Sequence, residues 1–261
     1  MNEVTQFWEN RSLKFGARIE GVLLKSVPEN INKYLSSWML EQVEGMIKKE
    51  SDFKVLDIGC GYGRLSGPLV NSFPGIKVFG VDIAQNYVDL YNKNLSPAGK
   101  ACRADSRDLP FKDNFFDAVF VVTALMYLPT KDDQSKAISE MLRVLKPGGK
   151  FVVVERSSLG YEIFTLGGII GKLRGKKNLE IPAVSFDPKY LSAVIGKYGA
   201  RVESLRGIPL FTIMFQVILV LSLINANIGG IFLNLIKLAD QQLSKFYFPS
   251  LYISYTGEKN G

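Results

Sequence analysis

Five short apolar segments alternate with stretches of helical periodicity in the central part of this chain. The apolar segments span residues 54–58, 77–81, 100–103, 116–122 and 150–154. The helical stretches between them span residues 64–72, 85–94 and 132–145. Strands that alternate with helices build βαβ units, in which helices cover both faces of a parallel sheet. The pattern predicts an α/β, doubly wound fold with a mainly parallel sheet.

The flanking segments complete this fold. Apolar residues recur at helical spacing between Ile31 and Ile47, and Pro28 stands near the start of that stretch. Asp187 followed by Pro188 predicts a capped helix that runs to about Lys197. Two further strands, 200–206 and 250–256, bring the expected sheet to seven. The predicted units are an N-terminal helical cap 1–50, an α/β core 51–206, an apolar helical hairpin 207–249 inserted in the core, and the last strand 250–261.

Residues 207–236 contain no charged side chain. Both ends of this stretch lead into strands of one sheet, which excludes a single membrane span if that sheet forms. A two-helix hairpin broken near residues 225–230 fits better. Three roles stay open for it: an apolar lid over the active site, a peripheral membrane contact beside the basic loop 172–177, or a homodimer interface. The simpler interpretation of the basic loop is a solvent-exposed loop without a specific partner.

The composition excludes several kinds of chemistry. The chain has no histidine, which removes Ser-His-Asp and Cys-His mechanisms and histidine-based metal sites. Its two cysteines, Cys60 and Cys102, do not have the spacing of a zinc site, and no metal is expected. The N-terminus lacks an apolar run after a basic start, so a cytoplasmic protein is expected, with the inner face of the membrane as the alternative location.

A glycine-rich loop follows the first predicted strand, in the sequence VLDIGCGYGRL at residues 55–65. Gly59, Gly61 and Gly63 let the chain turn sharply and approach a ligand closely. The following helix N-terminus favours a negatively charged group, and ligands of such sheets bind at the carboxyl ends of the strands. The spacing G-x-G-x-G, after Asp57, differs from the G-x-G-x-x-G of nicotinamide-binding loops.

Acidic residues follow the next two strands. Asp82 ends the segment VFGVD, where a carboxylate can accept hydrogen bonds from both hydroxyls of a ribose. Asp105 and Ser106 follow the third strand, where they can meet the edge of an adenine ring. A nucleotide-like ligand is therefore expected at this edge of the sheet.

The motifs VLDIGCGYG, VFGVDIA, ADSRDLPF, FFDAVFVVTALMYL and EMLRVLKPGGKFVVVE, in this order, resemble the class I S-adenosylmethionine-dependent methyltransferases, especially their small-molecule and lipid branch. The resemblance covers about 100 residues densely, and it implies S-adenosyl-L-methionine as the cofactor and a Rossmann-like methyltransferase fold. It also implies roles for individual residues. The three glycines would surround the methionine and ribose, Asp57 would hold the amino group, Asp82 would hold the ribose, Ile83 would pack on the adenine, Asp105 and Ser106 would contact the adenine edge, and Thr123 would offer its backbone to the methionine end.

Each of these positions also has a purely structural interpretation. Asp57 could cap the glycine loop, Asp82 could cap the next helix, and Asp105 could belong to an Asx turn. Tyr127 stands where many relatives have a histidine, and it could face the substrate or pack in the core. Glu155 could reach a substrate or form a salt bridge with Arg156 or a nearby lysine.

Methyl transfer needs mainly orientation of the acceptor, because the sulfonium is already activated. If a base is needed, the candidate catalytic residues are Tyr127, Glu155 and Tyr161. The favoured function is methyl transfer to a small, apolar or lipid-like acceptor. The alternatives are an RNA or protein methyltransferase and a non-catalytic, membrane-associated S-adenosylmethionine-binding protein. Nucleic acid is disfavoured as a partner, because the long apolar stretch fits it badly.

Overall fold

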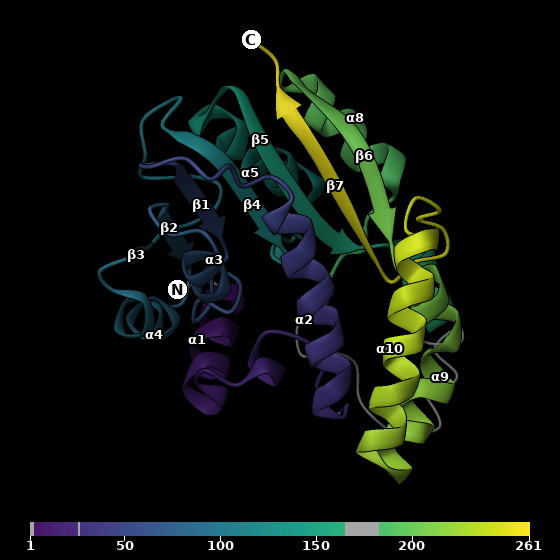
Figure 1. Cartoon of the computed structure of the whole chain (residues 1–261). Helices are drawn as coiled ribbons and strands as arrows, with labels where there is room; N and C mark the ends of the chain where they lie inside the picture. Colours follow the sequence, from purple (N-terminus) through teal and green to yellow (C-terminus); the bar gives the residue numbers. More distant parts are fainter. Residues whose placement is uncertain (1–2, 26, 165–182) are drawn as a thin grey trace.

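The computed structural model describes residues 3–25, 27–164 and 183–261. In this part of the chain seven strands form one sheet in the order β3-β2-β1-β4-β5-β7-β6 (Figure 1). The strands are β1 Lys54–Ile58, β2 Lys77–Asp82, β3 Gly99–Arg103, β4 Phe116–Val122, β5 Leu145–Arg156, β6 Ala200–Gly207 and β7 Tyr252–Lys259. Only β7 runs against its neighbours β5 and β6. The predicted seven-stranded, mainly parallel sheet is confirmed.

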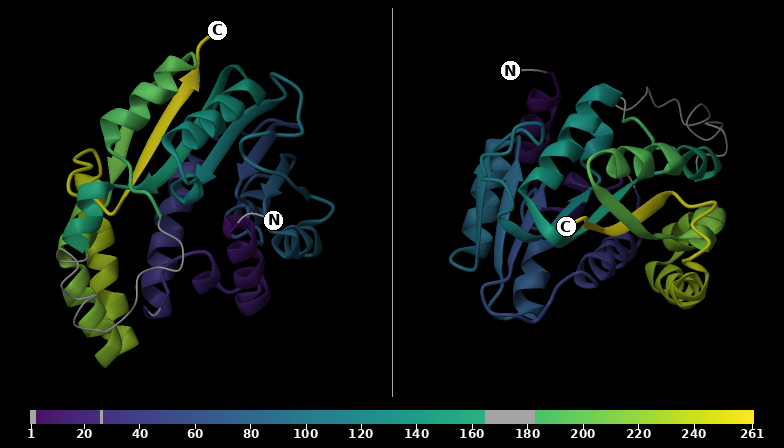
Figure 2. Two further views of the ribbon diagram at one scale, coloured as in Figure 1. Left: turned by 180° about the vertical axis from the view of Figure 1, so that it is seen from behind. Right: turned by 90° about the horizontal axis from the view of Figure 1, so that it is seen from above.

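Helices cover both faces of this sheet (Figure 2). They are α1 Glu3–Phe15, α2 Glu29–Glu44, α3 Ser66–Ser72, α4 Gln85–Leu95, α5 Lys131–Val144, α6 Ser158–Phe164, α8 Pro188–Lys197, α9 Pro209–Ile224 and α10 Ala226–Leu243, with short 3₁₀ turns at Ile19–Gly21 and Leu125–Tyr127. The predicted cap of α8 is present, since the Asp187 carboxylate accepts hydrogen bonds from the backbone amides of Lys189 and Tyr190. Strand β5 begins earlier than expected, because Leu145 pairs with Phe116 across a register shift.

The central strand β4 shows why the apolar segments had to be strands of a doubly covered sheet. Its residues Ala118, Phe120 and Val122 belong to the core that includes α2, α3, α9 and α10. The alternate residues Val119 and Val121 belong to the core that includes α5 and α8. Side chains of successive residues in a strand point to opposite faces, so a run without polar residues needs a partner on both.

The uncharged stretch forms a helical hairpin between β6 and β7, as predicted. Helices α9 and α10 meet at Asn225, whose side chain accepts hydrogen bonds from the backbone amides of Asn227 and Ile228. The hairpin is held to α2 by the buried Asp240, whose carboxylate accepts hydrogen bonds from the Tyr34 hydroxyl and the Phe211 amide. In the described ranges, none of the helices combines the length and apolarity needed to cross a membrane. The basic loop 172–177 lies outside the described residues.

Candidate active site

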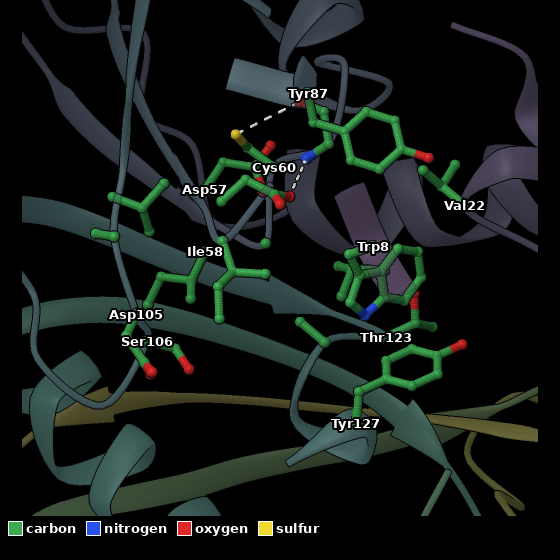
Figure 3. Close-up of a pocket in the computed structure, with 18 of the residues that line it drawn as sticks. Trp8, Val22, Asp57, Ile58, Cys60, Tyr87, Asp105, Ser106, Thr123 and Tyr127 are labelled. Atoms are coloured by element: carbon green, nitrogen blue, oxygen red, sulfur yellow. Dashed lines mark hydrogen bonds between the residues drawn. The ribbon is translucent and has the colours of Figure 1, made fainter. Parts of the chain in front are cut away.

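A pocket lies at the carboxyl ends of β1, β2 and β4, where the topology brings the loops after these strands together (Figure 3). It has about 940 Å³ of empty space, the open mouth included. The predicted cofactor residues that line it are Asp57, Gly59, Gly61, Asp82, Ile83, Asp105, Ser106 and Thr123. Helix α1 closes one side. The sequence thus located the pocket, although Gly63 lies behind its wall.

The glycine loop has the backbone that its sequence predicts. Gly59, Gly61 and Gly63 all have positive φ angles, of 76°, 53° and 87°. A Cβ on Gly59 would lie 2.7 Å from the Ala124 Cβ, and one on Gly63 would lie 2.4 Å from the Leu95 side chain. Gly63 therefore allows the close packing of α4 against the loop, and Gly59 allows the close approach of the loop to the turn after β4.

Asp82 ties the glycine loop to the second strand. Its carboxylate accepts hydrogen bonds from the backbone amides of Gly61 and Ala84, each at 2.9 Å. Burial raises the pKa of this carboxyl to about 6, against the opposing effect of these amides. Ala84 is the residue before α4, so Asp82 caps this helix and also lines the pocket. The remaining lone pairs of the carboxylate are available to a ligand.

Asp57 and Arg64 place opposite charges on one side of the pocket. The Asp57 carboxylate accepts a hydrogen bond of 2.6 Å from the Ser66 hydroxyl, and burial raises the pKa of the carboxyl to about 7. The Arg64 guanidinium donates to the Ser36 hydroxyl at 2.9 Å, and burial lowers its pKa. Both side chains line the pocket. This pair can receive a zwitterion.

Asp105 and Ser106 line the far end of the pocket from Trp8 and Tyr127 (Figure 3). The Asp105 carboxylate accepts hydrogen bonds from the Arg107 amide and guanidinium, forming the Asx turn that was the structural alternative. The Arg107 contact holds the pKa of Asp105 below its usual range. Asp105 therefore lines this wall, and its carboxylate is already hydrogen-bonded to Arg107.

Thr123 and Tyr127 follow β4 at the other end of the pocket. Thr123 has a φ of 55°, a strained value for a β-branched residue, which turns the chain sharply at the end of the strand. The Tyr127 ring packs edge-on against Trp8 of α1, with ring centroids 4.8 Å apart. Burial raises the pKa of the Tyr127 hydroxyl. Among the residues that the structure describes, this end of the pocket is lined mainly by aromatic and aliphatic side chains.

Glu155 and Tyr161, the other two candidate catalytic residues, are not part of the described pocket wall. The buried Glu155 carboxylate accepts hydrogen bonds from the backbone amides of Ala124, Leu125 and Met126 at 2.8–3.2 Å. These amides, and not the side chain of Arg156, are its hydrogen-bonding partners, and burial raises the pKa of its carboxyl to about 8. The Tyr161 ring instead stacks under the Arg156 guanidinium, 4.0 Å from the ring centroid.

Several residues that line the pocket were not predicted from the sequence. They are Val4, Trp8, Val22, Arg64, Tyr87 and Leu128. The position of Arg64, directly after the last glycine of the loop, was the one available signal. Trp8 had none, because α1 reaches the pocket through tertiary contacts. The Glu9 carboxylate accepts a hydrogen bond from the Gln85 amide at 2.8 Å, which fixes α1 to the start of α4.

The comparisons with known proteins agree with this geometry. The family model described as "Methyltransferase domain" matches residues 56–153. Sterol 4-C-methyltransferase strm-1 of Caenorhabditis elegans is 38% identical over 105 residues, which cover 38% of this chain and 30% of that protein. The ubiquinone/menaquinone biosynthesis C-methyltransferase UbiE of Desulfotalea psychrophila is 35% identical over 154 residues, covering 58% of this chain and 54% of UbiE. The aligned part therefore spans less than two thirds of either relative.

The fold is also found in solved structures of low sequence identity. The structure of the [4+2]-cyclase SpnF has a TM-score of 0.63 and 18% identity, covering 99% of this chain and 96% of SpnF. At this identity the likeness concerns the fold alone. Residues 56–153 of this chain thus match the methyltransferase domain family, and the strand order and the glycine loop at the pocket agree with that match.

Proposed function

We propose that this chain binds S-adenosylmethionine in the pocket and transfers its methyl group to a small, apolar or lipid-like acceptor. The observation that carries the proposal is the polarity of the pocket. Carboxylates and a guanidinium line the floor and one side, whereas Trp8, Tyr127 and Leu128 line the end beyond β4. A polar, partly charged cofactor and an apolar acceptor would then meet at the boundary between the two.

The residues of the polar part fit the cofactor in chemistry. Asp57 and Arg64 would receive the ammonium and carboxylate of its methionine end, because each presents the opposite charge. Asp82 would accept hydrogen bonds from the ribose hydroxyls, and Ile83 would pack on the adenine. Ser106 would meet the adenine edge beside Asp105. When bound, S-adenosylmethionine supplies an activated methyl group.

The protein would contribute orientation at the apolar end. Thr123 turns the chain so that backbone groups border the methionine end, and the Trp8–Tyr127 pair provides a rigid wall for an apolar acceptor. The Tyr127 hydroxyl, whose pKa burial raises further above neutral, is protonated and would position the acceptor by donating a hydrogen bond. The names of the sterol and quinone methyltransferases among the relatives support an apolar acceptor for this chain as well.

A second candidate is a reaction other than methyl transfer on the same scaffold. It is retained because a fold does not determine the chemistry of its site. The two candidates make different predictions about the fate of the cofactor.

The test combines binding and turnover. Purified protein is expected to bind S-adenosylmethionine by isothermal calorimetry, and to convert it to S-adenosylhomocysteine in the presence of a quinone, sterol or total-lipid extract. Absence of binding by folded protein would contradict the whole proposal. Binding without methyl transfer to any of these acceptors, or to a polar small-molecule panel, would favour the second candidate.

The affinity for S-adenosylmethionine is expected to rise as the pH rises from 6 to 8. Burial raises the pKa of the Asp57 carboxyl to about 7, and the cofactor ammonium prefers the ionised form. Below this pKa, binding must first remove a proton, which costs up to about tenfold in affinity per pH unit. Calorimetric titrations across this range, corrected for the ionisation of the cofactor itself, give the profile. Asp57→Asn should bind more weakly with a flatter profile, and an unchanged profile would contradict the role of Asp57.

A further inference from the structure

The hairpin α9–α10 carries two continuous stripes of exposed aliphatic side chains. On α9 the stripe consists of Ile213, Val217, Val220 and Ile224, and on α10 of Ile228, Ile231, Leu235 and Leu238. The spacings of three and four residues place each set along one side of its helix. Contiguous apolar patches exposed on the surface of a protein usually mark an interaction site.

The polar residues of α9 point the opposite way. The Thr212 hydroxyl accepts a hydrogen bond from the Leu251 amide, the Gln216 side chain donates to the Phe164 carbonyl, and the Ser222 hydroxyl accepts from the Asn30 side chain. All three contacts are made toward the body of the protein. Helix α9 therefore keeps its polar groups inside and offers only aliphatic groups outward, the arrangement suited to an apolar surrounding.

The turn of the hairpin is the most exposed part of this surface. Leu223 and Ile224 are 62% and 74% exposed, and every residue from 223 to 228 is exposed. The turn projects beyond the start of α2, to which the Asn30 contact with Ser222 fixes it (Figures 1 and 2). The end of α1 and the start of α2 lie at the same end of the molecule (Figure 1).

The charges at this end are mainly positive. Residues 13–33, which join the end of α1 to the start of α2, contain four basic side chains against two acidic ones; the basic ones are Lys14, Arg18, Lys25 and Lys33. Between Arg206 and Asp240 the hairpin contains one charged residue, Lys237, and it has no acidic residue near its turn. An anionic lipid surface is complementary to such an end, because it offers an apolar interior for the turn and negative headgroups for the cations. A second copy of this chain would instead bring two positive ends together.

The pocket lies close to this end. Helix α1 contributes Val4 and Trp8 to the pocket wall, and Val22 of the connecting segment contributes a third apolar contact. Val22 belongs to the segment at this end, and α1, which leads into that segment, carries Trp8 of the apolar end of the pocket.

We propose that the turn of the α9–α10 hairpin inserts into the surface of an anionic lipid bilayer, with the segment from the end of α1 to the start of α2 resting on the headgroups. The bilayer would then be the source of the apolar acceptor, a consequence that rests on the proposed function. Binding to the bilayer itself requires neither cofactor nor turnover.

Flotation of the full chain with vesicles tests this proposal. Wild-type protein is expected to float with vesicles of phosphatidylcholine and phosphatidylglycerol, to float less with phosphatidylcholine alone, and to be released by added salt. The double variant Leu223→Asn/Ile224→Asn should reduce partitioning by about tenfold or more, because two aliphatic side chains no longer enter the interface. The matched control Ile213→Asn/Leu238→Asn changes the same kind of residue at the other end of the stripes, and should stay within about twofold of wild type.

Three results would overturn the proposal. The first is the absence of flotation with anionic vesicles, and the second is an equal loss in both double variants. The third is a dimer in sedimentation equilibrium that dissociates when the stripe residues are changed, which would assign the surface to a second copy of the chain. Calorimetry with S-adenosylmethionine on the same samples should give the wild-type affinity for both variants. A failure of lipid binding is therefore distinguishable from a failure of the proposed function.

Discussion

Asp82→Ala is expected to weaken S-adenosylmethionine binding by about 100-fold or more, since a hydrogen bond to a charged group contributes about 1.5–3 kcal/mol. Two effects combine. The variant removes the proposed acceptor of the ribose hydroxyls, and it also leaves the Gly61 amide without the oxygen that holds the glycine loop at 2.9 Å. Calorimetric titration measures the change in affinity.

The control for Asp82 is Asp89→Ala in the same part of the chain. Asp89 is an exposed residue of α4 whose carboxylate accepts a hydrogen bond from the Gln85 side chain. Its replacement should leave the affinity within about twofold, as is usual for an exposed contact. Asp82→Asn keeps one acceptor oxygen and should bind with intermediate affinity. Wild-type affinity in a folded Asp82→Ala protein would remove Asp82 from the cofactor site.

Glu155→Ala is expected to lower the free energy of unfolding by about 3–5 kcal/mol, because an unsatisfied buried group costs about 1–3 kcal/mol. The carboxylate is the acceptor for three successive backbone amides, those of Ala124, Leu125 and Met126. For a chain of this size the loss corresponds to a fall in Tm of about 6–20 °C. Thermal unfolding followed by circular dichroism gives the value, and Glu50→Ala, an exposed substitution, should leave Tm within about 1–2 °C.

The pH dependence of this effect follows from the pKa of Glu155. Burial raises that pKa from 4.5 to about 8 in the folded protein. A raised pKa contributes stability that is fully present below the unfolded value and is lost as the pH rises through the folded value. The difference in stability between wild type and Glu155→Ala should therefore shrink between about pH 5 and pH 8.

Glu155→Gln separates a positioning role from a catalytic one. A base would lose turnover on this change while Tm stays the same. A residue that orders the turn after β4 should lose stability and turnover together, since Thr123 and Tyr127 depend on that turn for their places in the pocket. Loss of turnover alone would restore Glu155 as a catalytic base.

Local pattern was sufficient to predict the sheet and the residues of the polar side of the pocket. The strands β1 and β4 begin and end at the predicted residues, because a strand covered on both faces is made mainly of apolar residues. Gly59, Gly61 and Asp82 follow directly from strand ends, and the carboxyl ends of parallel strands meet at one edge. The position of these residues after a predicted strand was therefore enough to predict their place in the pocket.

Tertiary structure decided the identity of the remaining wall and the role of two carboxylates. Trp8 meets Tyr127 across more than a hundred residues of chain, and no local signal marks a contact of that range. Asp105 and Glu155 look alike in sequence, each an acid near the end of a strand. Their partners differ: Arg107 engages the first, while three backbone amides engage the second.

The hairpin shows the same division. The absence of charge in residues 207–236 and the break near Asn225 were enough to predict two apolar helices. Which of their sides faces outward could not be read from the sequence, because α9 is apolar nearly all round and its few polar residues could have pointed either way. The contacts of Thr212, Gln216 and Ser222 with the protein body decide it. Sequence determined what the elements are, and packing determined which of their surfaces remain available to a ligand or a lipid.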